Sequence, residues 1–232
     1  MATNTTIPTL DGKASFPAYV ASPGGTPRGA IIIVQEVFGV EKGIMTKADA
    51  WAARGYLAVA PDVFWRQEPG VELDADVPEQ FQKAIALMMG HDFDLGIQDI
   101  EAAIHWIRRE AGVPKVGLVG FCMGGKIAYM AATRTDIDAS VGYYGVGIDE
   151  MKGESHAIAK PLMLHIPTAD GFVSPDKQAV MHDALDPNPH CTLHDYEGLD
   201  HGFAAEVGTR RDEAAATLAD QRTADFFARH VG

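Results

Sequence analysis

The sequence predicts an α/β fold in which a mostly parallel sheet is covered by helices on both faces. Short apolar runs alternate with longer stretches of helical period along most of the 232 residues. This alternation is typical of βαβ units, whose helices cross from one parallel strand to the next. No internal repeat, low-complexity tract or linker divides the chain. We therefore expect a single domain over residues 1–232.

The expected strands are short, rich in β-branched residues and bounded by turn signals. The clearest covers residues 30–34, a nearly continuous apolar run of the kind that is buried on both faces of a sheet. The other expected strands cover residues 56–60, 115–120, 139–144, 161–166 and 191–196.

The expected helices lie between and after these strands. Residues 94–109 have the clearest period, because Ile97, Ile100 and Ile104 share one face and Gly112 supplies a stop. We expect residues 62–77 to form a long surface loop of the kind that frames sites. The remaining helical segments cover residues 41–54, 78–89, 124–134, 175–184 and 212–229.

Charge and composition limit the partners and the compartment. Nineteen basic and thirty-two acidic residues give a formal net charge of −13, which disfavours nucleic acid and anionic membrane surfaces as partners. No apolar run is long enough to span a bilayer, and Met1–Val20 lacks the pattern of a signal peptide. We expect Cys122 and Cys191 to be free thiols in a cytoplasmic protein.

The strongest local motif is Gly120-Phe121-Cys122-Met123-Gly124-Gly125, which lies between an expected strand and an expected helix. It matches the nucleophile-elbow pattern G-x-S-x-G with cysteine in place of serine. A sharp turn holds the middle residue in a strained conformation, and the flanking glycines remove side chains that would collide. The following helix N-terminus favours a thiolate and offers amide groups to an oxyanion. Cys122 is therefore a candidate nucleophile.

Two other interpretations of this segment stay open. Free cysteine is among the most buried residue types, so Cys122 could be an ordinary core thiol. Residues 120–127 also resemble the phosphate loop G-x-x-x-x-G-K-[ST], although Ile127 stands where a magnesium-binding hydroxyl is needed and Lys126 could simply be solvated. Magnesium-dependent nucleotide binding would distinguish this second alternative.

A thiol nucleophile needs a base and a carboxylate that orients the base, in the chain order nucleophile, acid, histidine for this kind of elbow. Asp170 follows the expected strand 161–166, and His201 follows the expected strand 191–196. Because ligands bind beyond the carboxyl ends of parallel strands, both are candidate partners of Cys122. No pair of histidines has the spacing of a helical metal site, so we expect no metal.

Several short motifs follow the expected strands in a characteristic order. They are Gln35-Glu36-Val37-Phe38-Gly39, the cysteine elbow, Val141-Gly142-Tyr143-Tyr144-Gly145-Val146-Gly147, Asp170 and His201-Gly202-Phe203. In this order and spacing they resemble the dienelactone hydrolase family, from about residue 12 to the last residue. The resemblance implies the α/β-hydrolase fold and an enzyme that opens an unsaturated lactone through a Cys-His-Asp triad without a cofactor.

The resemblance also implies roles for individual residues. Cys122 would be the nucleophile, His201 the base and Asp170 the residue that orients His201. Glu36 would lie beside the nucleophile and take the thiol proton when substrate binds. The backbone N–H groups of Val37 and Met123 would form the oxyanion hole. We expect the substrate to contact Phe38, Phe81, Ile85, Tyr144 and Phe203.

The sequence departs from the family pattern in the residues that hold a substrate carboxylate. Well-known members use two arginines, one before the elbow and one a few residues beyond the catalytic histidine. Here residues 80–89 offer only Lys83, and no arginine follows His201 before Arg210. We therefore expect an apolar pocket that prefers uncharged or weakly charged acyl groups. Lys83, Arg66 and Arg210 are the candidate clamps if a carboxylate is bound.

These observations predict a hydrolase that opens lactones or cleaves small carboxylic esters through an acyl-thioester on Cys122, as a monomer or a small homo-oligomer. The alternative from another class is a non-catalytic binding or redox-sensing relative in which Cys122 is oxidised. A sensor needs no oriented histidine and carboxylate, which favours the enzyme.

Overall fold

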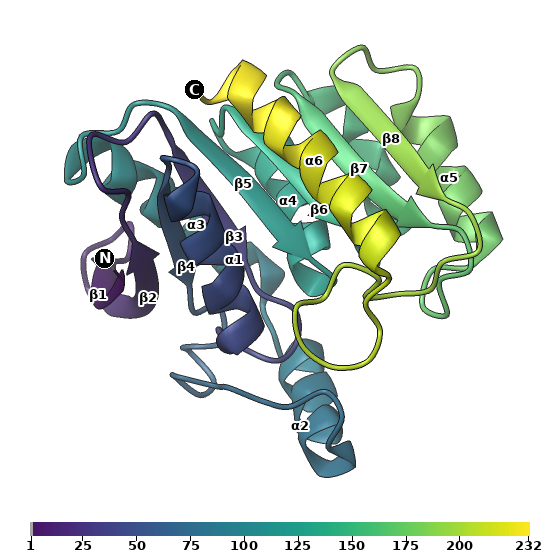
Figure 1. The fold of residues 1–232 in the computed structure, drawn as a ribbon, viewed down its shortest axis with the longest axis horizontal. Coiled ribbons are helices and arrows are strands. Elements are labelled where there is room, and N and C mark those ends of the chain that lie inside the picture. The colour runs from purple at the N-terminus through teal and green to yellow at the C-terminus, as the bar shows by residue number, and fades with distance from the viewer. Residues whose placement is uncertain (1) are drawn as a thin grey trace.

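A computed structural model describes residues 2–232, and its centre is an eight-stranded sheet (Figure 1). The expected α/β fold with a mostly parallel sheet is confirmed. All six expected strands form, each within a residue or two of its expected bounds. The strands are β1 (Ala2–Pro8), β2 (Ser15–Ala21), β3 (Ala30–Val34), β4 (Leu57–Pro61), β5 (Val116–Phe121), β6 (Ala139–Tyr143), β7 (Leu162–Pro167) and β8 (Cys191–Tyr196).

The strand order is β1-β2-β4-β3-β5-β6-β7-β8. From β4 to β8 every pair of neighbours is parallel, whereas β1, β2 and β4 pair antiparallel. Parallel neighbours require crossover connections, which explains the helices between the strands. The carboxyl ends of β3 and β5 to β8 therefore lie at one edge of the sheet, and the motifs singled out in the sequence all follow these ends.

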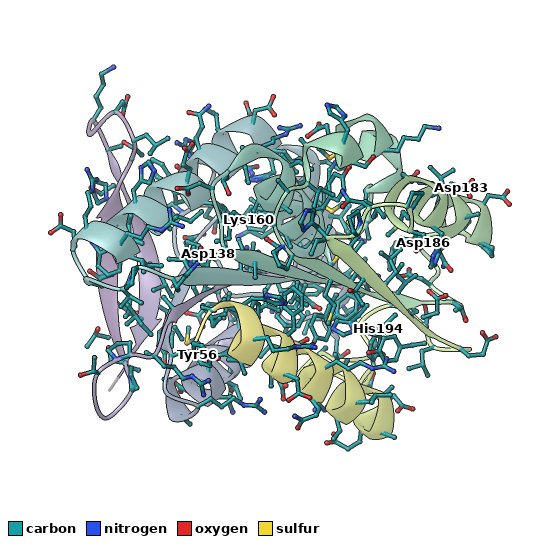
Figure 2. The ribbon with its side chains drawn as sticks, turned by 90° about the horizontal axis from the view of Figure 1, so that it is seen from above. Tyr56, Asp138, Lys160, Asp183, Asp186 and His194 are labelled. Atoms are coloured by element: carbon teal, nitrogen blue, oxygen red, sulfur yellow. The ribbon has the colours of Figure 1, made fainter. Side chains whose placement is uncertain are left out.

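Helices cover both faces of the sheet. The Trp51 ring packs edge-on against the Phe227 ring at 5.3 Å, which joins α1 and α6 on one face, while α3, α4 and α5 cover the other face (Figure 2). Within residues 2–232, every helix is too short or too polar to cross a lipid bilayer. The helices are α1 (Lys42–Ala53), α2 (Pro78–Met89), α3 (Phe93–Arg109), α4 (Met123–Arg134), α5 (Pro175–Leu185) and α6 (Glu213–His230).

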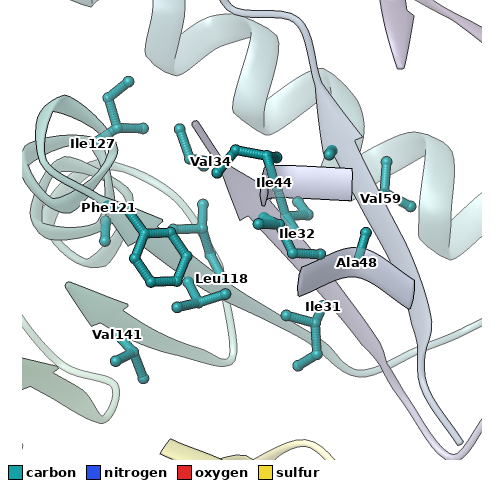
Figure 3. Packing of buried hydrophobic residues seen from close by; sticks show 14 of the residues in the cluster. Ile31, Ile32, Val34, Ile44, Ala48, Val59, Leu118, Phe121, Ile127 and Val141 are labelled. Carbon is teal, nitrogen blue, oxygen red and sulfur yellow. The ribbon is translucent and has the colours of Figure 1, made fainter. Parts of the chain in front are cut away.

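The core forms where the central strands meet these helices (Figure 3). All five residues of β3 and all six of β5 are buried, as expected for strands covered on both faces. Ile44 and Ala48 of α1 pack on one side of this pair, and Ile127 of α4 packs on the other. This packing fixes the turn between β5 and α4, where the elbow motif lies.

Two elements were not expected from the sequence. The hairpin of β1 and β2 forms at the edge of the sheet, and of the seven residues of β1 only Ile7 is buried. A strand this exposed carries almost no alternation of apolar and polar residues, which is the signal that predicts strands. The second element is a 3-10 helix, η1 (Asp149–Ala157), which has no buried residue.

Candidate active site

Cys122 occupies a strained turn between β5 and α4. Its φ and ψ angles are 54° and −114°, a combination that residues other than glycine rarely adopt. Its amide donates to the carbonyl of Tyr143 at 3.0 Å, and its carbonyl accepts from the amide of Gly125 at 2.9 Å. A Cβ atom at Gly120 would stand 1.9 Å from the carbonyl oxygen of Gly124. The glycines of the motif are thus needed for the close approach of the two arms of the turn.

The surroundings of this turn can be compared with the two other interpretations of the motif, a buried core thiol and a phosphate loop. Cys122 is 9% exposed, and its side chain lines a pocket together with Glu36 and His201. The thiol therefore faces a cavity as well as the core. The ammonium group of Lys126 lies 4.3 Å from the centre of the Phe93 ring, so this lysine is engaged on an aromatic face instead of reaching over the turn.

His201 and Asp170 come together at the carboxyl edge of the sheet. Asp170 lies in the loop after β7 and His201 in the loop after β8, and His201 Nδ1 is 2.9 Å from Asp170 Oδ2. The other oxygen of Asp170 accepts from the amides of Phe172 and Val173 at 2.8 and 3.3 Å. Both side chains of the pair are almost fully buried. The carboxylate is thus fixed by its own loop and in turn fixes the imidazole ring.

Asp200 ties these two loops together. Its Oδ1 accepts from the amide of His201 at 2.6 Å and from the amide of Gly171 at 2.9 Å. Hydrogen bonds from both amides lower the pKa of Asp200, so the bridge is a carboxylate at neutral pH. The geometry of the His201–Asp170 pair therefore has a second support.

The protonation of His201 depends on Cys122. Burial by itself lowers the pKa of His201, but the charge of the Cys122 thiolate opposes burial and, with the hydrogen bond to Asp170, raises the pKa to about 10. A thiolate at Cys122 therefore stabilises a protonated imidazole at His201. The same interaction places the Cys122 sulfur within reach of the imidazole ring.

Aromatic rings surround the imidazole of His201. Phe172 contacts it edge-on at 4.8 Å and is half exposed, while Tyr144 contacts it edge-on at 4.9 Å and is buried. Phe203 packs against Tyr144 at 5.7 Å and against Tyr196 at 4.7 Å. Tyr144 and Phe203, which the sequence placed among substrate contacts, thus lie in the aromatic cluster behind His201 and outside the lining of the pocket.

The pocket at Cys122 has a mainly apolar wall. Phe38, Phe81 and Ile85 line it, at positions that the sequence assigned to substrate contact. Val146 and Phe172 also line it and were not expected, because they lie on loops that carry no periodic signal. The complete lining is Glu36, Val37, Phe38, Phe81, Ile85, Met88, Cys122, Val146, Phe172, His201 and Arg210.

Of the three candidate clamps, only Arg210 lines this pocket. Lys83 pairs with Glu68 at 2.7 Å, and Arg66 forms an ion pair with Asp99. Arg210 lies 3.7 Å from Glu36, measured from Nη2 to Oε2, and 5.9 Å from the centre of the Phe38 ring. One guanidinium group therefore lies in the pocket wall beside Glu36, and it comes from the loop after His201.

Glu36 is a buried carboxylate with incomplete hydrogen bonding. It follows β3, lines the pocket, and its Oε1 atom is buried without a hydrogen-bond partner. Val37 follows it in the same wall, and Met123 begins α4, where the first amides of a helix lack intrahelical acceptors. Within residues 2–232, no group of three or more histidine, cysteine, aspartate or glutamate side chains could hold a metal ion.

The parallel sheet, the strained elbow and the histidine and carboxylate from later loops define a hydrolase of the α/β-hydrolase class. Residues 16–231 match the model of the dienelactone hydrolase family, and the chain belongs to this family. The family and fold class expected from the sequence are confirmed.

Relatives of known sequence and structure agree with this membership. The chain is 42% identical over 231 residues to a protein of Azospirillum brasilense provisionally named carboxymethylenebutenolidase, with 99% of this chain and 100% of that protein covered. It is 36% identical to a carboxymethylenebutenolidase of Pseudomonas putida, with 96% and 94% covered. A Klebsiella pneumoniae structure provisionally described as a dienelactone hydrolase superposes with a TM-score of 0.88 at 27% identity, with 99% of both chains covered.

Proposed function

We propose that the protein hydrolyses lactones and small carboxylic esters through an acyl-thioester on Cys122. The observation that carries this proposal is the contact of 2.9 Å between His201 Nδ1 and Asp170 Oδ2 at the pocket that Cys122 lines. A nucleophile, a base and a residue that orients the base are thereby available at one cavity. The carboxymethylenebutenolidase names of the relatives support the same substrate class.

Activation of the thiol requires a base other than His201. The pKa of His201 is about 10 when the Cys122 thiolate stands beside it, so we propose that His201 stays protonated and that the thiol proton goes to another group. Glu36 is the buried carboxylate in the pocket wall. We assign Glu36 as the group that accepts the Cys122 proton, which leaves a thiolate paired with the His201 imidazolium.

The thiolate then attacks the substrate carbonyl and forms a carbon–sulfur bond. The negative charge moves to the carbonyl oxygen, which the amides of Val37 and Met123 stabilise as the oxyanion hole. Collapse of this intermediate breaks the carbon–oxygen bond of the ester or lactone. The departing alkoxide takes the proton of His201, so the products of this half-reaction are an acyl-thioester and a neutral imidazole.

Water completes the cycle. The neutral imidazole of His201 takes a proton from water, and the resulting hydroxide attacks the thioester carbonyl while Asp170 stabilises the imidazolium that forms. The carbon–sulfur bond breaks, the carboxylic acid product leaves, and the thiolate–imidazolium pair is restored. Every step uses groups of this chain and water, so the proposed reaction needs no cofactor.

The pocket supports a small acyl group with little charge. Phe38, Phe81 and Ile85 offer apolar surface to the acyl group. Arg210 provides one guanidinium group, whose present partner is Glu36. A substrate carboxylate would have to compete with Glu36 for Arg210, which is why we propose that neutral and weakly charged acyl groups are preferred.

Substitution of Cys122 tests the proposal. Cys122→Ala should abolish hydrolysis of p-nitrophenyl acetate and leave the melting temperature within a few degrees of the wild type. Cys191→Ala is the matched control, because Cys191 is the other free cysteine and lies on β8 outside the pocket lining. The control should retain full activity. Turnover by Cys122→Ala at the wild-type rate would overturn the proposal and leave a sensing or binding role for the thiol.

A further inference from the structure

Tyr144 has a strained backbone next to the proposed triad. Its φ angle is 40°, and among residues 2–232 only Cys122 and Tyr144 combine a positive φ with a side chain larger than that of glycine. A positive φ is energetically unfavourable for a residue with a bulky side chain, and residues strained in this way cluster at functional sites. The proposed nucleophile is thus the one other residue under the same kind of constraint.

Backbone contacts impose this conformation. The amide of Tyr144 donates to the carbonyl of His165 on β7 at 2.9 Å, while the carbonyl of Tyr143 accepts from the amide of Cys122 at 3.0 Å. The end of β6 is therefore held between the next strand and the elbow. The Tyr144 ring then contacts the imidazole of His201 edge-on at 4.9 Å. Strain at Tyr144 maintains a contact with the proposed base.

The Tyr144 hydroxyl is buried, and no partner meets it at full hydrogen-bonding geometry. Oε1 of Glu36 is buried without a partner as well. Burial raises the pKa of Tyr144 well above its usual value, and the charge of Glu36, its contact with the hydroxyl and the charge of Cys122 raise it further, so the three groups lie in one neighbourhood. A hydroxyl that keeps its proton is a donor, and an ionised carboxylate is an acceptor. The two unsatisfied groups are chemically complementary.

Other charged and titratable groups around Glu36 are few. Arg210 approaches Oε2 at 3.7 Å, from the loop after β8. Cys122 and His201 share the pocket wall with Glu36, and Glu41, at the N-terminus of α1, has its pKa raised by burial and by the charge of Glu36. Arg210 can therefore serve Oε2. The neutral donors that remain beside Glu36 are the Tyr144 hydroxyl and the Cys122 thiol, and the thiol loses its proton in the proposed reaction.

We propose that Tyr144 is a positioning residue for activation of the thiol, because its hydroxyl donates to Oε1 of Glu36 while its ring holds the imidazole of His201. This inference rests on the proposed role of Glu36 as the base for Cys122. The hydrogen bond fixes the orientation of the carboxylate and stabilises its ionised form, and the Tyr144 proton stays on oxygen throughout. The proton of Cys122 passes to a remaining lone pair of Glu36 as the sulfur–hydrogen bond breaks.

The pH profile of Tyr144→Phe tests the inference. The variant keeps the ring on His201 and removes only the hydroxyl. In this variant the ionised form of Glu36 loses a hydrogen-bond donor. The acidic limb of the pH profile, which is the range in which kcat/KM for p-nitrophenyl acetate falls as the pH is lowered, should therefore move to higher pH by about one unit. We expect kcat at pH 7 to fall roughly tenfold, a loss equivalent to about one hydrogen bond to a charged group, with KM nearly unchanged.

Tyr143→Phe is the matched control for loss of a buried tyrosine hydroxyl. The Tyr143 hydroxyl bonds Asp220 at 3.0 Å and Thr223 at 2.7 Å, both on α6 and away from Glu36. Tyr143→Phe should lower the melting temperature and leave the acidic limb in place. An identical shift in Tyr143→Phe and Tyr144→Phe would overturn the inference, because it would show a general effect of the lost hydroxyl.

A double variant shows whether Tyr144 acts through Glu36. In the Glu36→Gln background no carboxylate remains to be stabilised, so adding Tyr144→Phe should cause no further shift or loss. An additive effect, or an unshifted profile in the single variant, would overturn the inference. Cys122→Ala separates this failure from failure of the proposed function: an inactive Cys122→Ala with an unchanged Tyr144→Phe profile refutes only the role of Tyr144.

Discussion

Asp170 Oδ2 and His201 Nδ1 lie 2.9 Å apart, although the two residues are 31 positions apart in the sequence. Neighbouring parallel strands β7 and β8 end at the same edge of the sheet and bring the two loops together. Asp200 then bridges the loops through two backbone amides. The contact is therefore a product of the topology, and it fixes which nitrogen of His201 remains for the proposed reaction.

Asp170→Asn should reduce kcat strongly and leave the fold intact. The amide can present its NH2 group to Nδ1 and stabilise the wrong tautomer of His201, and equivalent changes in catalytic triads cost roughly 10³- to 10⁴-fold in kcat. Ester hydrolysis measured beside a thermal melt checks this. Asp195→Asn is the control, because Asp195 pairs with His182 on the exposed side of β8 and should keep the wild-type rate. Wild-type kcat in Asp170→Asn would contradict the assigned role.

The titration of His201 should depend on the Cys122 thiolate. In the wild type, burial lowers the pKa but the thiolate and Asp170 raise it to about 10, so the ring stays protonated at neutral pH. In Cys122→Ala the thiolate is gone while burial persists, and the pKa should fall markedly. Nuclear magnetic resonance of the histidine ring between pH 5 and 11 measures both values. Equal pKa values in the two proteins would show that Cys122 and His201 are not coupled.

Arg210 should govern the response to charge on the substrate. Removal of its guanidinium in Arg210→Met should lower kcat/KM for a lactone that bears a carboxylate by roughly 10- to 100-fold, the effect of losing a hydrogen bond between charged groups. An uncharged lactone of the same ring size should change by less than about threefold. Lys83→Met is the control, since Lys83 pairs with Glu68 outside the pocket lining. Parallel losses on both lactones would contradict a charge-specific role.

Hydrophobic period and turn residues predicted the central fold. β3 and β5 are continuous apolar runs because both faces are buried, and α3 shows a clear stripe because one face packs on the sheet and α4. The same reasoning missed β1, whose exposed residues carry no pattern. Local sequence thus predicted the central strands but missed the whole hairpin, in which β2 buries Phe16, Ala18 and Val20 while β1 buries only Ile7.

The sequence predicted those residues of the candidate site that directly follow a strand. Cys122, Asp170 and His201 each follow a recognisable strand, and topology then brings them together. Arg210 comes from a loop whose path depends on long-range contacts, among them the bond from Lys47 to Glu206 at 2.9 Å. No local pattern encodes such a path. The same limit explains why Phe172 was not among the expected substrate contacts.

The central claim is that substrate becomes covalently attached to the Cys122 sulfur. Intact-mass spectrometry of the enzyme quenched in acid during turnover of p-nitrophenyl acetate, followed by peptide mapping, tests this directly. We predict a single added acetyl group of about 42 Da on the peptide that contains Cys122, absent from Cys122→Ala. An acetyl group on another residue during full turnover, or labelling that persists in Cys122→Ala, would contradict the account.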